Sequence, residues 1–160
     1  MAHEPADDTP GIRFLPPFVY LGGLILGYAI WWFWPVPIAP AEWSFAIRVA
    51  GGVAIVLGFW VMLSAVAAFR RIDEDPNPME PTGTLTFDGP YTLTRNPMYL
   101  GMALILGGLA LAGNALWPLL ALVPVIWVIR TQVIAKEEAY LEAKFGNEYR
   151  EFKARVRRWL

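Results

Sequence analysis

The chain has 160 residues, enough for a single domain over 1–160, and its net charge of −1 provides no basic field for a nucleic-acid partner. Its hydrophobic share is 56%, above the roughly 45–50% of soluble domains, and the apolar residues come in long uncharged blocks. Cysteine is absent and the one histidine, His3, lies in a polar N-terminal segment, which argues against disulfides, metal sites and Ser/His/Asp catalysis.

Four apolar stretches are long enough to cross a bilayer, which takes about 20 residues and tolerates about 17–25. They come after residues 1–13, expected to be a flexible tail without the basic start of a signal peptide. The spans are predicted at residues 16–34, 44–69, 97–113 and 116–135. Because two residues separate the last two spans, these should form an antiparallel helical hairpin. The predicted fold class is an all-α integral membrane protein with about four transmembrane helices.

Lysine and arginine residues gather between the second and third spans and after the fourth. The connections 35–43 and 113–116 contain none. By the positive-inside rule, loop 70–96, the active site and both termini are expected on the cytoplasmic side, in a bacterial inner membrane. Within the spans, Gly23-x-x-x-Gly27 predicts close packing of helices.

The C-terminal segment 136–160 is predicted to be an amphipathic cytoplasmic helix. Apolar residues recur in it at three- and four-residue spacing, at Leu141, Phe145, Tyr149, Phe152, Val156 and Trp159. Basic residues on the other face suit an anionic membrane surface, and packing of the stripe on the protein itself is the alternative. Gly146 predicts a break in the helix, with Asn147 as the N-cap of the second half.

Polar side chains gather at the start of the third span, in GPYTLTRNPMYLG, residues 89–101. Asn96 followed by Pro97 is typical of a helix N-cap and first helical position. A helix N-terminus also presents free N–H groups that bind a carboxylate or phosphate. Topology brings this region close to Glu137 and Glu138, which cannot share one helix face. One of them can face a ligand while the other pairs with Lys or Arg.

Two arginines are further candidates in this region. Arg130 lies within the fourth span, where a charge should face the bundle interior and have a partner. Arg95, beside the entrance of the third span, can bind an anionic group of a lipid or a substrate. Carboxylate and aromatic groups on one side of this region, with the helix N-terminus on the other, suit a zwitterionic ligand with an amino acid end.

The order and spacing of these motifs resemble the isoprenylcysteine carboxyl methyltransferase family and the related membrane phospholipid methyltransferases. The matching residues are GPY at 89–91, RNPMYLG at 95–101 and E-E-x-x-L-x-x-x-F-G-x-x-Y at 137–149. The resemblance covers residues 70–158. It implies an all-helical membrane enzyme that takes S-adenosyl-L-methionine from the cytosol and a lipophilic acceptor from the bilayer.

The resemblance also implies roles for single residues. Contacts with S-adenosyl-L-methionine would fall on Gly83, Thr84, Leu85, Thr86, Tyr91, Asn96, Pro97, Met98, Tyr99 and Glu137. The candidates for catalysis or acceptor binding are Arg130, Arg95 and Glu138. Two positions depart from the family. Asn96 stands where a histidine is common, and Val133 stands where the carboxyl methyltransferases have a substrate arginine, a role left open to Arg130 one turn away.

Methyl transfer from a sulfonium requires alignment of two reactants and exclusion of water, and it requires no cysteine, histidine or metal. The function that the resemblance implies is methyl transfer from S-adenosyl-L-methionine to a lipophilic membrane-resident acceptor, a phospholipid amine or an isoprenylcysteine-like carboxylate. A membrane reductase with a nicotinamide cofactor is the alternative enzyme, because sterol reductases resemble the same C-terminal half. A non-catalytic membrane adaptor is the third possibility. The acceptor and the oligomeric state stay open.

Overall fold

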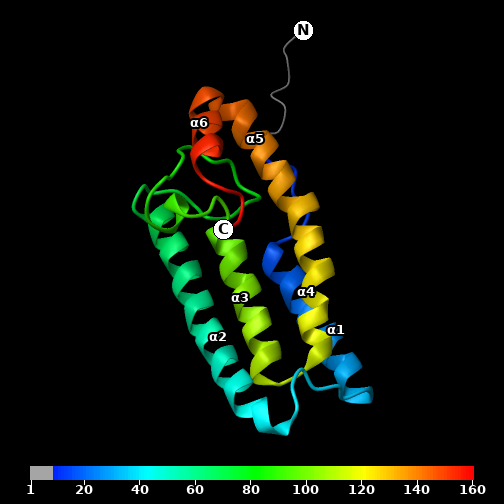
Figure 1. The fold of residues 1–160 in the computed structure, drawn as a ribbon. Coiled ribbons are helices and arrows are strands. Elements are labelled where there is room, and N and C mark those ends of the chain that lie inside the picture. Colours follow the sequence, from blue (N-terminus) through cyan, green and yellow to red (C-terminus); the bar gives the residue numbers. More distant parts are fainter. Residues whose placement is uncertain (1–8) are drawn as a thin grey trace.

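In the computed structural model, which describes residues 9–160, the chain is helical and that range contains no β-strand (Figure 1). The predicted all-α class is therefore confirmed, while His3 lies outside the described residues. The elements are α1 (Pro16–Phe33), α2 (Ala41–Arg70), the 3-10 turn η1 (Gly89–Thr92), α3 (Pro97–Ala112), α4 (Leu116–Val128), the π-helical segment η2 (Ile129–Ile134), α5 (Ala135–Phe145) and α6 (Asn147–Arg155).

Three helical stretches of residues 9–160 are long and apolar enough to cross a membrane. They are α1, α2 and the continuous helix Leu116–Phe145, which joins α4, η2 and α5; their mean hydropathies are 1.3, 2.3 and 1.8. The remaining predicted span, α3, has 16 residues, so it is about 24 Å long against roughly 30 Å of hydrocarbon. Four complete crossings therefore stay a prediction.

The outer faces of α1 and α2 are apolar. Phe45, Val56 and Trp60 of α2, with Phe18 and Leu26 of α1, each leave 60% or more of their surface exposed. Contiguous apolar surface of this extent is unfavourable in water and is the surface that lipid tails cover. The chain is thus a multi-pass membrane protein.

Glycines allow α2 and α3 to pack with their backbones in contact. A Cβ added to Gly58 would lie 2.7 Å from the carbonyl oxygen of Gly101, and a Cβ added to Gly108 would lie 2.7 Å from that of Gly51. The two pairs are about two helical turns apart, so the contact runs along both helices. In a membrane, where lipid provides no hydrophobic drive between helices, such close contact is a main source of attraction.

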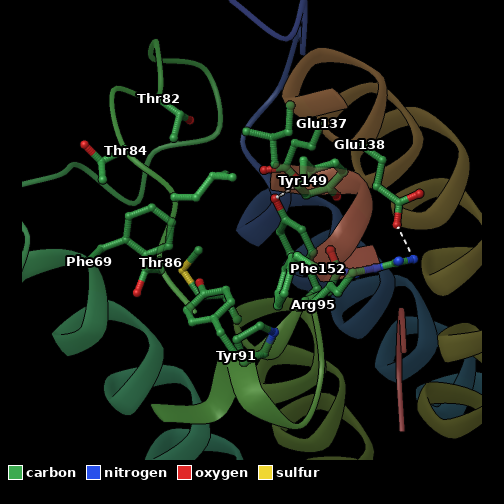
Figure 2. A pocket seen from close by; sticks show the side chains of 16 residues that line it. Phe69, Thr82, Thr84, Thr86, Tyr91, Arg95, Glu137, Glu138, Tyr149 and Phe152 are labelled. Atoms are coloured by element: carbon green, nitrogen blue, oxygen red, sulfur yellow. Dashed lines mark hydrogen bonds and ion pairs between the residues drawn. The ribbon is translucent and has the colours of Figure 1, made fainter. Parts of the chain in front are cut away.

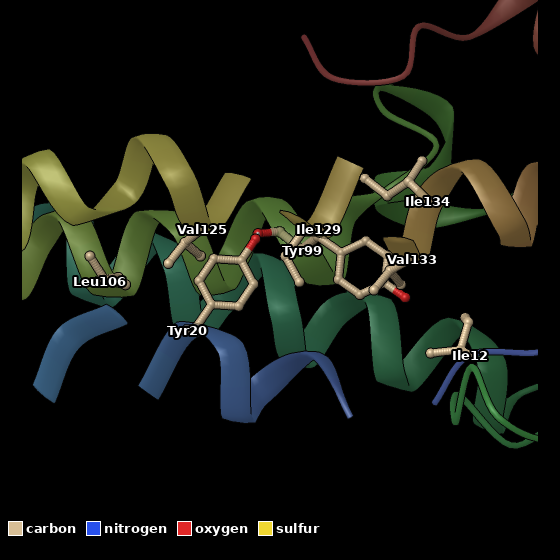
Figure 3. Packing of buried hydrophobic residues seen from close by; sticks show 8 residues of the cluster. All are labelled: Ile12, Tyr20, Tyr99, Leu106, Val125, Ile129, Val133 and Ile134. Carbon is tan, nitrogen blue, oxygen red and sulfur yellow. The ribbon is translucent and has the colours of Figure 1, made fainter. Parts of the chain in front are cut away.

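The helix α1 packs on α4 through the predicted glycine pair. A Cβ on Gly23 would lie 2.4 Å from Val125, and one on Gly27 would lie 2.4 Å from Pro118, which confirms the prediction of close packing there. Between α1, α3 and α4 lies a core that Figure 3 shows from close by. Its buried residues are Ile12, Tyr20, Tyr99, Leu106, Val125, Ile129, Val133 and Ile134.

The side chain of Asn114 links the two short connections at one end of the bundle, alongside backbone hydrogen bonds such as that from the N–H of Leu116 to the carbonyl of Val36, at 3.0 Å. The Oδ1 atom of Asn114 accepts hydrogen bonds from the N–H groups of Ile38 and Ala39, at 3.1 and 3.0 Å, and its Nδ2 donates to the carbonyl oxygen of Ala39 at 2.9 Å. Asn114 also has a φ of 50°, a left-handed conformation that Asn tolerates better than most residues. The tight α3–α4 hairpin is as predicted.

At the other end of the bundle, loop 71–96, α5, α6 and the C-terminal residues form a polar cap (Figure 1). The start of the described chain joins it, because Lys136 Nζ donates to the carbonyl of Gly11 at 3.2 Å. Ile12 is buried, so this part of the predicted flexible tail packs on the protein. The remainder of that tail, residues 1–8, lies outside the described residues.

The helical break predicted in the C-terminal segment is at Gly146, which has a φ of 55° and separates α5 from α6. Asn147 is the first residue of α6 and does not cap it; its Oδ1 accepts from Arg150 instead, at 2.6 Å. The apolar stripe faces the protein. Tyr149 and Phe152 are buried, and their rings lie 6.1 Å apart. Contact of this segment with the membrane surface stays a prediction.

Candidate active site

A pocket lies where the polar cap meets the ends of the helices (Figure 2). Loop 82–86, η1 and the start of α3 form part of its wall, and α5 and α6 complete it. In Figure 2, Phe69 and Thr84 lie on one side of the pocket, and Glu137 and Tyr149 lie on the other. The fold thus brings together segments that are about 70 positions apart in the sequence.

Most of the site residues implied by the resemblance line this pocket. They are Thr84, Leu85, Thr86, Tyr91, Arg95, Asn96, Pro97, Met98, Tyr99, Glu137 and Glu138. Gly83 is not among the lining residues; its N–H donates to Glu74 Oε2 at 3.0 Å and holds the loop in place.

Arg130 does not reach the pocket either, and the expectation that it faces the bundle interior is corrected. Its side chain is exposed on η2. A long arginine side chain near the end of a span can extend along the apolar surface until its guanidinium group reaches water. Arg130 therefore requires no partner inside the bundle.

Five lining residues are not among the predicted site residues: Phe69, Thr82, Leu141, Tyr149 and Phe152. Leu141, Tyr149 and Phe152 belong to the apolar stripe of the C-terminal segment. The periodicity of this stripe predicts packing on the protein as well as membrane contact, so it does not identify pocket residues. Phe69 lies at the end of a lipid-facing helix, and Thr82 lies in a loop without periodicity. No local pattern distinguishes either of them.

Glu137 and Tyr99 form the polar centre of the pocket. The Tyr99 hydroxyl donates to Glu137 Oε2 at 2.9 Å, and Tyr99 is buried. Tyr91 forms a further part of the wall and stacks edge-on against Phe69, with ring centroids 5.6 Å apart. Burial raises the pKa of the Tyr91 phenol, and the negative charge of Glu137 raises it further. Tyr91 therefore stays a neutral phenol near pH 7 and does not serve as a base.

Glu138, unlike Glu137, is surrounded by basic side chains. Its carboxylate accepts from Arg95 Nη2 at 2.9 Å and from Arg158 Nε at 3.0 Å, with a second contact to Arg158 Nη2. Glu138 is buried, and a buried charge requires such partners. The two adjacent carboxylates were expected to have different partners. Glu138 is held between two guanidinium groups, whereas Glu137 lines the pocket and contacts Tyr99. Glu138 and Arg95 therefore fix the wall.

The C-terminal residues pass across the start of α3. Asn96 Nδ2 and the hydroxyl of Thr94 both donate to the carbonyl of Arg158, at 2.9 and 3.1 Å, and the N–H of Arg95 donates to that of Arg157 at 2.9 Å. Asn96 occupies the N-cap position as predicted, but its side chain makes no cap hydrogen bond. No side-chain hydrogen bond thus caps the first N–H groups of α3.

Loop 82–86 covers the pocket with few polar contacts. The N–H of Thr82 donates to the Tyr140 hydroxyl at 3.2 Å, and Leu85 and Phe87 pack on the apolar cluster around Phe152. The free volume of the pocket is about 80 Å³, small compared with the roughly 300–1,000 Å³ of sites for drug-sized ligands.

The chain is similar to known methyltransferases over the segment that builds this pocket. Residues 46–148 match the phospholipid methyltransferase family. A stretch of 65 residues is 52% identical to an uncharacterized protein of Haemophilus influenzae and covers 39% of this chain and all of that protein. No solved structure matches.

A second relative is protein-S-isoprenylcysteine O-methyltransferase of Schizosaccharomyces pombe, 38% identical over 73 residues. This match covers 45% of the chain and 30% of the yeast protein, so the chain spans under a third of that relative. The family match is broader: it covers more than half of the chain and includes RNPMYLG and the Glu137-Glu138 pair. The chain belongs to the phospholipid methyltransferase family.

Proposed function

We propose that this protein transfers a methyl group from S-adenosyl-L-methionine to a lipophilic acceptor in the membrane, with the site on the cytoplasmic side. The observation that carries the proposal is the position of Glu137. Its carboxylate is oriented by Tyr99 in a pocket at the boundary between an apolar helical bundle and a polar cap. A water-borne cationic donor and a membrane-borne acceptor can meet at such a boundary.

The lining residues fit the proposed donor. Glu137 provides a negative charge for an ammonium or sulfonium group, and the rings of Phe69 and Tyr91 provide apolar surface for a flat base. Arg95 Nε is a buried donor without a hydrogen-bond partner in the described part of the chain. Because a buried donor without a partner costs roughly 1–3 kcal/mol, the carboxylate of S-adenosyl-L-methionine would be favourable at this wall.

When bound, S-adenosyl-L-methionine supplies an electrophilic methyl group whose bonding electrons return to sulfur as the acceptor takes the methyl. The protein's part is to hold the reactants in line and keep water out, which can lower a barrier by about 7–11 kcal/mol. Met98, Leu141 and Phe152 supply apolar wall for this purpose. Among the carboxylates of the lining, Glu137 is the one outside the arginine network, so it is placed to take a proton from an acceptor amine.

The charges around the pocket favour an acceptor without a carboxylate. Val133, at the position of the family's substrate arginine, is fully buried in the core between the helices. Arg130 lies away from the pocket. Arg95 is the one basic residue in the lining; it is paired with Glu138, and its free Nε is assigned above to the carboxylate of the donor. An acceptor carboxylate would therefore be buried without a free cation, which is unfavourable. We propose an amine acceptor.

Two measurements test the function. Calorimetry in detergent should show binding of S-adenosyl-L-methionine, and the purified protein should transfer labelled methyl to a membrane lipid extract, from which the product is identified. Glu137→Gln is the variant that should lose both. Absence of binding and transfer would contradict the proposal. Binding of a nicotinamide dinucleotide in place of S-adenosyl-L-methionine would favour the reductase, and binding of neither would favour the adaptor.

A further inference from the structure

Tyr20 lies next to the candidate active site on a helix that the family match does not include. The match begins at residue 46, whereas α1 ends at Phe33. Tyr20 is buried, and its hydroxyl donates to the main-chain carbonyl of Tyr99 at 2.9 Å. Figure 3 shows both tyrosines in the core cluster between the helices. A residue of α1 therefore contacts the residue whose hydroxyl binds Glu137.

Tyr99 belongs to the first turn of α3, and a first helical turn depends on contacts from outside the helix. Its N–H groups have no acceptor one turn earlier, and Pro97 has no N–H at all. Asn96 makes no side-chain cap hydrogen bond. Yet this turn supplies Pro97, Met98 and Tyr99 to the pocket lining. Side chains of other elements that bind this turn therefore determine where part of the pocket wall lies.

The Tyr20 hydroxyl provides such a contact at the residue that matters most for Glu137. The carbonyl of Tyr99 accepts from Tyr20 of α1, and the hydroxyl of Tyr99 donates to Glu137 Oε2 of α5 at 2.9 Å. Tyr99 is thus bound at its main chain and at the end of its side chain. Because a buried hydroxyl that loses its acceptor is unfavourable, the bond from Tyr20 maintains the position of Tyr99 relative to α1.

We infer that Tyr20 is a positioning residue for the methyl-transfer site, which acts through Tyr99 to hold the Glu137 carboxyl group where the donor binds. The inference rests on the proposed function. It gives α1, which lies outside the family match, a part in building the site.

A second tyrosine of α1 provides a matched control. The Tyr28 hydroxyl donates to the main-chain carbonyl of Leu109 at 2.8 Å, so it also joins α1 to α3. It lies about two helical turns further along α1, and neither Tyr28 nor Leu109 lines the pocket. Tyr28→Phe therefore removes a bond between the same two helices without a direct effect on the site.

Tyr20→Phe removes one hydroxyl and keeps the ring that packs in the core. We expect it to weaken binding of S-adenosyl-L-methionine about three- to tenfold in calorimetry, whereas Tyr28→Phe should stay within about twofold of the wild type. Thermal unfolding of both variants verifies that each is folded at the temperature of the measurement. Equal losses of affinity in the two variants, or an unchanged affinity in Tyr20→Phe, would overturn the inference.

A double-mutant cycle tests whether Tyr20 acts through Tyr99. Tyr99→Phe removes the hydrogen bond to Glu137. If the effect of Tyr20 passes through that bond, adding Tyr20→Phe to Tyr99→Phe should cost less than about twofold more in affinity. An additional loss as large as that in the wild-type background would show that Tyr20 acts independently of the Tyr99 hydroxyl, and would contradict the inference.

A third measurement does not depend on ligand binding. Fluorotyrosine is incorporated at position 99, and its ¹⁹F resonance is recorded in the otherwise unchanged protein and in the two Phe variants. Tyr20→Phe should shift or broaden this resonance, and Tyr28→Phe should leave it unchanged. If the wild type binds no S-adenosyl-L-methionine but this difference is found, the proposed function is wrong while the positioning of Tyr99 by Tyr20 stands. A resonance that Tyr20→Phe does not alter would refute that positioning.

Discussion

Replacement of Glu138 by Gln tests whether this carboxylate is structural. Glu138 is held between Arg95 and Arg158, and in its pair with Arg95 the two side chains are 8% and 10% exposed. Glu138→Gln keeps the size of the side chain but removes the charge, so two guanidinium groups lose their counter-ion. One of them, Arg95, also donates to the carbonyl of Lys153, and its displacement would loosen α6.

The magnitude depends on burial. Loss of one partner of a fully buried ion pair costs about 3–5 kcal/mol, and the 32% exposure of the Arg158 side chain reduces the penalty on that side. We expect a loss of about 2–4 kcal/mol in the free energy of unfolding. For a chain of this size, that lowers the midpoint of thermal unfolding by about 5–10 °C.

Glu142→Gln is the matched control, one turn further along α5. Glu142 pairs with Lys153 at 2.8 Å, but both side chains are about one third exposed, so its replacement should have little effect. Thermal unfolding in detergent, followed by tryptophan fluorescence, compares the two variants with the wild type. Equal midpoints for the two variants, or a Glu138→Gln variant as stable as the wild type, would refute the assignment of Glu138 to the framework of the pocket.

Four further outcomes are expected. Glu137→Gln should weaken binding of S-adenosyl-L-methionine by about ten- to a hundredfold in calorimetry without lowering the unfolding midpoint, because one charge-assisted hydrogen bond is worth roughly 1.5–3 kcal/mol; an unchanged affinity would argue against the assignment. Gly58→Val should destabilise the protein by about 1–3 kcal/mol or more in thermal unfolding, because its Cβ would meet the backbone of α3, whereas Gly52→Val, with open space around its Cβ, should not. A reporter that is active only outside the cytoplasm, fused after Leu160, should stay silent; strong activity would overturn the proposed orientation. A prenylcysteine analogue should not be methylated by the wild type in the labelled-methyl assay, and efficient methylation would show that the acceptor carries a carboxylate.

The apolar spans, the hairpin and the helical break at Gly146 could be predicted because each depends on local composition. Hydrophobic length, a two-residue connection and a glycine with positive φ each act within a few residues of their own position. The contacts of Asn96 could not be predicted in this way. Its position before Pro97 is local, but its side chain binds the carbonyl of Arg158, 62 positions later, and this contact depends on the path of the C-terminal residues.

The placement of Arg130 could not be predicted either, because the helix that carries it is not a regular α-helix. In a regular α-helix, residues seven positions apart lie on nearly the same face, so Arg130 and Glu137 would both point at the pocket. The segment between them is π-helical over Ile129–Ile134, and a π turn contains an extra residue. The added residue rotates Arg130 away from the face of Glu137. Periodicity alone does not reveal such a change of register.

The same π-helical segment bears on the choice of acceptor. It places Val133 in the apolar core and Arg130 on the outer surface, while Glu138 neutralises Arg95. The basic groups that an anionic acceptor would need are therefore occupied or distant, and Glu137 is the carboxyl group of the pocket lining that lies outside the arginine network. Selectivity of this kind acts by excluding the wrong head group, since an anion would be desolvated in the pocket without a free cation. An amine can instead form a hydrogen bond with the Glu137 carboxyl group, and this difference is the physical basis for expecting an amine-bearing lipid.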